Sequence, residues 1–170
     1  MRRSPPTRRP LRMTTRTDPA LAPIVKTLSV KANPERAFDV FARQMGDWWP
    51  VHRMAVSPGA KGAPPRAVTV EPFAGGRIYE TAPDGEEFDW GVIAVFEPGR
   101  RLEFSWYPGL PPEKATRVGV RFEAEGQGCR VTLVHDGWEG RPGGREARPD
   151  YVTGWDYVFG QCYGGYLEPA

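Results

Sequence analysis

The segment "RLEFSWYPGLPPEKATRVGVRFEAEGQGCRVTLVHD" (101–136) decides the fold class. Apolar and polar residues alternate in three runs within it, at 101–107, 115–125 and 129–136. A period of two is typical of β-strands that bury one face. Because the connecting "PGLPPEK" and "GQG" are rich in turn-forming residues, the three runs are expected to form an antiparallel meander.

The preceding segment, 67–97, extends this pattern upstream. Its alternating runs are separated by "PDG" (83–85), and "PGR" (98–100) joins it to the next strand. In "GVIAVF" (91–96) both faces are apolar, so periodicity does not define the inward face of this strand. A β-bulge is expected there.

The N-terminal part of the domain predicts a strand followed by a helix. "IVKTLSVKA" (24–32) reads as the strand. Asn33 suits a helix N-cap and Pro34 the first helical position, ahead of "PERAFDVFARQM" (34–45). The helix is expected to end at "GDWWP" (46–50), whose adjacent tryptophans cannot enter one regular core in the same way.

Two glycine-rich segments differ in their pattern. "SPGAKGAPPR" (57–66) has no periodicity and is expected to be a loop. "PDYVTGWDYVFGQCYGGYLE" (149–168) carries apolar residues every three or four positions, which predicts an amphipathic helix. Each of its four glycines costs about 1 kcal/mol relative to alanine. Either a strand passes close to the helix backbone, or the helix is a loosely held lid.

The order of these elements predicts an α+β, helix-grip fold. A curved antiparallel sheet of six or seven strands would wrap around the long C-terminal helix, with short helices after the first strand. One domain is expected over 24–168. The preceding basic, Pro-rich stretch 1–23 is expected to be a disordered leader, with Met13 as an alternative start.

The charge distribution argues against nucleic acid as a partner. Six arginines and no acid lie in the first sixteen residues, which leaves 17 basic and 21 acidic residues in the rest. The folded part therefore lacks the positive charge of a nucleic-acid-binding surface. The leader has no apolar run of signal-peptide or membrane-span length, so we expect a cytoplasmic protein with no membrane contact.

Few residues suggest catalysis or metal binding. Cys129 and Cys162 read as reduced thiols. Together with His52 and His135 they have no metal-ligand spacing, so no metal and no cofactor is expected. No set of nucleophile, base and orienting group is recognisable. His135 shares a strand face with apolar residues. It is expected either to orient a ligand or act as an acid or base, or to be a hydrogen-bonded histidine at a strand end.

Four stretches together resemble the activator-of-heat-shock-protein-ATPase-homologue family of the START-like superfamily. They are "NPERAFDVFARQMGDWWP" (33–50), "DWGVIAVFEPGRRLEFSW" (89–106), "CRVTLVHDGWE" (129–139) and "GWDYVFGQCYGGYLE" (154–168). The resemblance runs from about Ile24 to Leu167, and the glycine-rich final helix departs from the family pattern.

The resemblance implies a cavity between the sheet and the C-terminal helix. One residue of the double tryptophan would close the end of the sheet, and the other would face the cavity rim. Aromatic rings with polar tips suit such a pocket. Each of them taken singly is more often a core residue than a ligand contact, so the case for a site rests on their number. The candidate ligand-binding residues are Trp49, Tyr79, Trp90, Phe104, Trp106, His135, Trp155 and Phe159.

Three classes of function remain open at this point. The first is binding of a small hydrophobic or aromatic molecule without catalysis, by a monomer or weak dimer. The family resemblance also implies a chaperone-ATPase co-regulator, which would act through a protein partner. A START-like cyclase or hydrolase would require His135 or a buried acid inside the cavity. An open pocket would favour binding, whereas a filled interior would favour protein interaction or a scaffold.

Overall fold

A computed structural model describes residues 18–168 of the chain. In chain order its elements are η1 (Pro19–Leu21), β1 (Ile24–Val30), α1 (Pro34–Arg43), α2 (Met45–Trp48), α3 (Ser57–Lys61), β2 (Ala67–Val70), β3 (Arg77–Thr81), β4 (Glu87–Glu97), β5 (Arg101–Trp106), η2 (Pro112–Lys114), β6 (Thr116–Glu125), β7 (Gly128–Asp136), η3 (Trp138–Gly140), α4 (Gly144–Trp155), the π-helical segment η4 (Asp156–Tyr163) and α5 (Gly164–Leu167).

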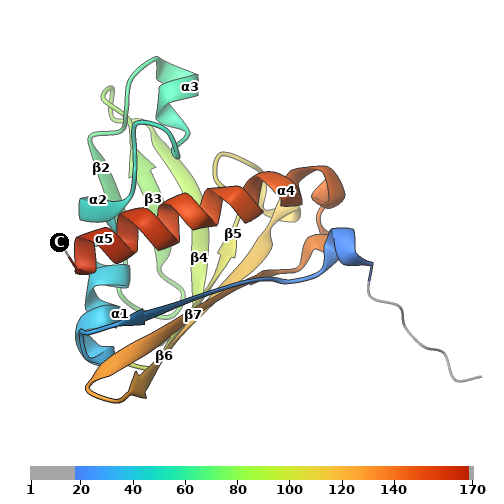
Figure 1. The fold of residues 1–170 in the computed structure, drawn as a ribbon. Coiled ribbons are helices and arrows are strands. Elements are labelled where there is room, and N and C mark those ends of the chain that lie inside the picture. The colour runs from blue at the N-terminus through green and yellow to red at the C-terminus, as the bar shows by residue number, and fades with distance from the viewer. Residues whose placement is uncertain (1–17, 169–170) are drawn as a thin grey trace, which may run out of the picture.

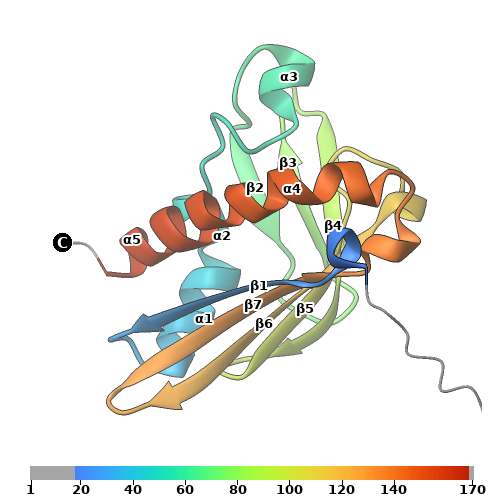
Figure 2. The ribbon, with the colours of Figure 1, turned by 45° about the vertical axis from the view of Figure 1, so that its right-hand side comes forward.

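The seven strands form one antiparallel sheet in the order β1-β7-β6-β5-β4-β3-β2. The sheet curls around the C-terminal helix, which crosses its concave face, while α1 and α2 cover one end (Figures 1 and 2). The expected helix-grip fold and the meander over 101–136 are thus confirmed.

The ambiguous strand β4 contains the expected irregularity. Its register with β5 shifts between Ile93 and Val95. Trp90 and Ile93 are buried, which defines the inward face. Gly91 lies so close to β5 that a Cβ atom there would stand 1.8 Å from the Ser105 carbonyl oxygen. Only glycine therefore allows the two backbones to approach in this way.

The C-terminal helix begins five residues earlier than expected, at Gly144 instead of Pro149. Proline favours a helix start, but here the extra turn is held by tertiary contacts. Arg148 Nε donates to the Ala22 carbonyl oxygen at 2.6 Å, and Arg145 pairs with Asp18. Residues 18–22, which belong to the expected leader, therefore pack on α4. The expectations for 1–17, including a start at Met13, lie outside the described residues.

The glycines of this helix do not serve a close backbone approach. A Cβ added at Gly154, Gly160 or Gly165 would meet nothing within 4 Å. One at Gly164 would lie 3.4 Å from a Leu28 methyl group and 3.7 Å from the Phe159 carbonyl oxygen, both ordinary van der Waals contacts. Of the two explanations offered by the sequence, the passing strand is thus excluded for three of the four positions.

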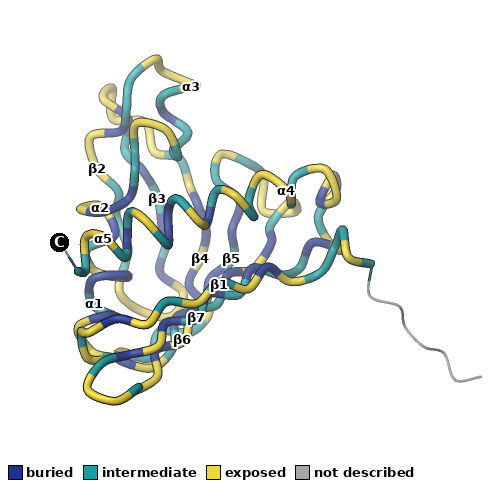
Figure 3. Tube along the Cα trace, viewed as in Figure 1, coloured by how far each residue is buried: buried dark blue, intermediate teal, exposed yellow. Residues whose placement is uncertain are grey.

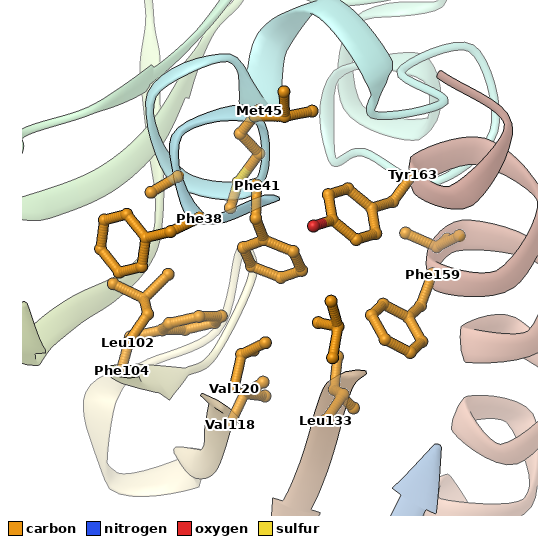
Figure 4. Close-up of a cluster of buried hydrophobic side chains, with 14 of the residues drawn as sticks. Phe38, Phe41, Met45, Leu102, Phe104, Val118, Val120, Leu133, Phe159 and Tyr163 are labelled. Atoms are coloured by element: carbon orange, nitrogen blue, oxygen red, sulfur yellow. The ribbon is translucent and has the colours of Figure 1, made fainter. Parts of the chain in front are cut away.

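The buried layer lies between the concave sheet face and the helices, as the dark segments in Figure 3 show. Figure 4 shows its α1 end, where Phe159 and Tyr163 of the C-terminal helix point toward Phe41 of α1, above Val120 of the sheet. Tyr163 Oη donates to the Ala37 carbonyl oxygen at 2.7 Å, which ties this helix to α1.

In the part of the chain that the structure describes, no helix combines the length and the hydropathy needed to cross a bilayer.

Candidate functional site

The adjacent residues Trp48 and Trp49 pack their rings against different parts of the core. α2 ends at Trp48, and Trp49 turns to an extended conformation (φ −65°, ψ 131°). Trp48 packs on Phe41 and Tyr163, at centroid distances of 5.2 Å each. Trp49 contacts Trp90, 4.9 Å away, and the rings of Trp48 and Trp49 lie 5.5 Å from each other. The change in backbone conformation lets both adjacent rings be buried, so the core admits both, each on its own side.

Trp49 belongs to a group that we call the tryptophan cluster, which consists of Trp49, Trp90, Trp106 and Trp155. Trp106 is central, with centroids 5.6 Å from Trp49, 5.7 Å from Trp90 and 6.1 Å from Trp155. The four rings come from the end of α2, from β4, from β5 and from α4, and all are more than 90% buried. Segments distant in the sequence thus contribute one continuous aromatic surface.

A small apolar pocket of about 60 Å³ adjoins this cluster. It lies between the segment after α2 and the C-terminal helix. Its lining residues are Trp49, Met54, Tyr151, Gly154, Trp155 and Val158. A cavity of roughly 150 Å³ accommodates benzene. Even benzene therefore fits only if the surrounding rings separate. The space beside the tryptophan cluster is nearly filled, so the open cavity that the family resemblance implied is not found there among residues 18–168. Pocket volume taken alone thus favours protein interaction or a scaffold, and binding requires the rings to move.

His135 lies beside the cluster and is fully buried, on the inward face that the sequence predicted. Its Nδ1 accepts a hydrogen bond from Trp155 Nε1 at 3.0 Å. Because an indole nitrogen can only donate, the proton of neutral His135 is on Nε2, which donates to Thr116 Oγ1 at 2.6 Å. The Thr116 hydroxyl donates to the Trp106 carbonyl oxygen at 3.3 Å. Both nitrogens of the histidine are thus satisfied within the protein.

Burial, aided by the positive charge of Arg141, lowers the pKa of His135 from 6.5 to about 3. The side chain is neutral at physiological pH for this reason. In this state His135 accepts the hydrogen bond that orients Trp155. The acid–base alternative would instead require a pKa near neutrality.

Glu80 is a buried carboxylic acid that sequence reasoning missed. It is fully buried on β3 and accepts N–H bonds from Val56 at 2.5 Å, Trp90 Nε1 at 3.1 Å and Ser57 at 3.3 Å. The two backbone donors lie at the start of α3, a helix that forms within the stretch 57–66 expected to be a loop. A carboxyl group at a helix N-terminus satisfies otherwise unpaired donors, so Glu80 explains why α3 forms.

Tyr79 does not join the cluster. It alternates with the buried Ile78 and Glu80, so its side chain lies on the opposite face of β3. There its ring packs under Arg77, whose guanidinium lies 4.0 Å from the ring centroid. The structure therefore corrects this expectation, because the inward position belongs to Glu80.

The other two candidates are buried at different places. Phe104 contacts Trp106, at 5.7 Å between centroids. Phe159 stacks on Tyr163 at 5.7 Å with an interplanar angle of 8°, closer to the α1 end of the core. Seven of the eight candidates thus point inward, and Trp49, Trp90, Trp106, Trp155, Phe104 and His135 form one connected group.

Two larger grooves, of about 310 and 420 Å³, lie over the outer face of the sheet. Their charged residues alternate along the strands with inward-facing core residues. Charges of both signs line them and pair with each other, as Arg117 does with Asp136 at 2.9 Å and with Glu103 at 3.8 Å. Exposed pairs of this kind are ordinary surface features, so the grooves are weaker site candidates than the aromatic cluster.

Within residues 18–168 no group of three or more His, Cys, Asp or Glu side chains is arranged to hold a metal ion. Cys129 is buried, which raises the pKa of its thiol, and Cys162 is half-buried. Both are free thiols.

Solved structures with the same fold are known. Protein MLL2253 from Mesorhizobium loti has a TM-score of 0.61 and 17% identity, with 86% of this chain and 96% of that one covered. The Aha1 dimer from Colwellia psychrerythraea has a TM-score of 0.62 and 16% identity, with 87% and 97% covered. At this level of identity both show the fold alone.

A third structure is closer in sequence. It is Txn09, described as an anthrahydroquino-γ-pyrone synthase complexed with SUM, with 30% identity, a TM-score of 0.53, and 76% of this chain and 86% of that one covered. No curated protein sequence matches the chain. The profile of the family described as "Activator of Hsp90 ATPase homolog 1-like protein" matches residues 31–161, which is most of the chain. The chain therefore belongs to this family.

Proposed function

We propose that the protein binds a flat aromatic small molecule between its C-terminal helix and its sheet. The observation that carries this proposal is the meeting of four tryptophans from separate elements beside an apolar pocket. Rings in tilted or edge contact present faces that a planar molecule can stack on once they separate. Trp49 and Trp155 line the pocket and would move first.

The surroundings of the pocket support such a separation. Trp155 lies at the end of α4, where the helix continues as a π-helical segment, and such segments are frequent at functional sites. Gly154 and Gly160 lower the helical propensity on either side of it without any steric need for glycine. This part of the helix is therefore the one from which we expect opening at lowest cost.

Binding can be tested by intrinsic tryptophan fluorescence. Titration with a panel of flat aromatics, fatty acids and flavonoid-like compounds should give saturable quenching by the flat aromatics. Trp49→Leu removes one pocket wall and should weaken binding about tenfold, the loss expected for one buried aromatic contact. Trp138→Leu is the matched control, because it makes the same change at a fully buried tryptophan that does not line the pocket. Circular dichroism checks that both variants fold.

A flat response across the panel would overturn the proposal. The tryptophans would then be core residues, and the protein-partner function of a chaperone-ATPase co-regulator would become the leading candidate.

A second candidate function is catalysis on a bound aromatic polyketide, favoured by the 30% identity to the synthase Txn09. Both nitrogens of His135 are engaged here, so acid–base work would require the substrate to displace Trp155 from Nδ1. Mass spectrometry of panel compounds after incubation distinguishes the two functions. Compounds recovered unchanged support binding alone, and conversion that is lost in His135→Gln supports catalysis.

A further inference from the structure

The six tryptophans of the chain differ in how their indole N–H groups are paired. Five of them donate to the protein. Their acceptors are the Val40 carbonyl for Trp48, the Met54 carbonyl for Trp49, Glu80 for Trp90, the His135 carbonyl for Trp138 and His135 Nδ1 for Trp155. Trp106 Nε1, in contrast, is buried without an acceptor among residues 18–168.

An unpaired buried donor is costly, and folded proteins rarely leave one. An indole nitrogen has one hydrogen and no accepting capacity, so only an oxygen or another acceptor can satisfy it. Trp106 is 3% exposed, which keeps bulk water away from this atom. Its N–H is therefore poised to gain a full hydrogen bond from any acceptor that reaches it.

Trp106 does not line the pocket, but its ring lies directly behind two residues that do. Its ring contacts both Trp49 and Trp155, which line the pocket. A ligand that separates these two rings would reach Trp106 next. The remaining unpaired buried donors among the described residues belong to arginines, namely Arg101 in the outer grooves and Arg141 in the segment after η3. Trp106 alone carries its unpaired donor within the tryptophan cluster.

We propose that the Trp106 indole N–H is a specificity-determining donor that recognises a carbonyl oxygen on the flat aromatic ligand. This inference rests on the proposed binding function and deepens it. A neutral carbonyl fits better than an anion, because the pocket-lining residues include no cationic side chain among those described. The ligand class is thus a ring ketone, such as a pyrone, a quinone or a fluorenone-like compound.

The test compares 9-fluorenone with fluorene, which share one flat three-ring skeleton and differ at a single carbon, C=O against CH₂. Equilibrium dialysis should show fluorenone binding wild-type protein about tenfold more tightly, the value of one buried hydrogen bond. Trp106→Phe keeps an aromatic ring but has no N–H, so it should bind both compounds about equally. Trp138→Phe makes the same change at a buried tryptophan whose N–H is paired elsewhere, and it should keep the preference.

The wild-type protein provides a second measurement that does not depend on the folding of a variant. In ¹H–¹⁵N spectra the Trp106 indole proton should move downfield with fluorenone and much less with fluorene. Equal affinities, or equal shifts, would overturn the carbonyl assignment while leaving the binding function in place. Absence of binding by both compounds would overturn the binding function and this inference together.

Discussion

The two ends of the core pack aromatic rings at similar distances but with different chemistry. At the α1 end a group of rings that we call the phenylalanine core, Phe38, Phe41, Phe96 and Phe122, has centroid separations of 5.1–6.2 Å. The tryptophan cluster has separations of 4.9–6.1 Å. Phenylalanine rings need nothing but burial, whereas every indole also needs an acceptor.

This difference separates a structural region from a candidate site. In the phenylalanine core, stability comes mainly from buried apolar area. Among the described residues, the one charged group over its rings is the Arg43 guanidinium, 5.3 Å from the Phe96 centroid. The tryptophan cluster depends on the buried polar groups Glu80, His135 and Thr116, and it still leaves one donor unpaired. A buried donor without an acceptor destabilises a core. In a binding site the same donor is useful, because the ligand can supply the missing acceptor. Changes at the two ends should therefore have different consequences.

Phe41→Ala should have the largest effect, a loss of about 3–5 kcal/mol in the free energy of unfolding. Phe41 is fully buried and contacts Trp48, Phe122 and Tyr163, so its removal leaves a cavity that its neighbours cannot fill. Urea denaturation followed by circular dichroism measures the loss. Phe73→Ala, at a ring that is 55% exposed, is the control and should change stability by less than about 0.5 kcal/mol. A loss at Phe41 as small as that of the control would contradict a purely structural core.

Glu80→Ala should cost somewhat less, about 3 kcal/mol, because it leaves the N–H groups of Val56, Ser57 and Trp90 without their acceptor. Glu80→Gln keeps one acceptor oxygen and nearly the same shape, so it should recover part of the loss. Urea denaturation compares the two, with Glu113→Ala at an exposed position as the control. Equal losses for both Glu80 variants would contradict this recovery. They would mean that the one acceptor oxygen of glutamine cannot replace a side chain that accepts from all three donors.

His135 makes the stability of the tryptophan cluster depend on pH. Its pKa is about 3 in the folded protein and near 6.5 when unfolded, so the unfolded chain takes up the proton first as the pH falls. The contribution is complete above pH 6.5 and is lost progressively toward pH 3. Between pH 7.5 and 5.5 the loss should be about 1.4 kcal/mol.

Urea denaturation at these two pH values tests this linkage. His135→Gln should be less stable at pH 7.5 but should show a much smaller change between the two values. His52→Gln removes the exposed histidine and should keep the wild-type pH dependence. The same slope in His135→Gln as in wild type would show that another group is responsible.

The sequence predicted the rings of the tryptophan cluster better than the polar groups that pair with them, for a physical reason. Alternation along 101–136 placed Phe104, Trp106 and His135 inward, because a half-buried strand has to alternate. At β3 the preference of aromatic residues for burial suggested Tyr79, although the alternation from Ile78 favours Glu80. The backbone donors that stabilise buried Glu80 lie 23 and 24 residues away in the sequence, so no local pattern predicts them.

Two further features required the three-dimensional structure. The helix start at Gly144 depends on contacts with residues 18–22, against the local preference of Pro149. The missing acceptor of Trp106 is a property of its surroundings and has no signal in the sequence. The alternation of apolar and polar residues therefore predicted the fold and the inward faces of the central strands. The polar partners that distinguish the candidate site from the core depend on tertiary contacts and could not be predicted in this way.

The smallest expected effect concerns the C-terminal helix, which spans both regions. Gly160→Ala should stabilise the protein by about 0.5–1 kcal/mol, because the added methyl group meets no atom within 4 Å and alanine is the better helix former. It should also slow amide exchange over 156–163 if this segment opens locally next to the tryptophan cluster. Gly59→Ala, in α3, adds a methyl group to equally open space and should leave exchange over 156–163 unchanged. If this helix opens locally, amide protection over 156–163 in the wild-type protein should be lower than that of strand β6. Equal protection would mean that the helix over the tryptophan cluster is as stable as the sheet beneath it, and the ligand would have to enter from the α2 side.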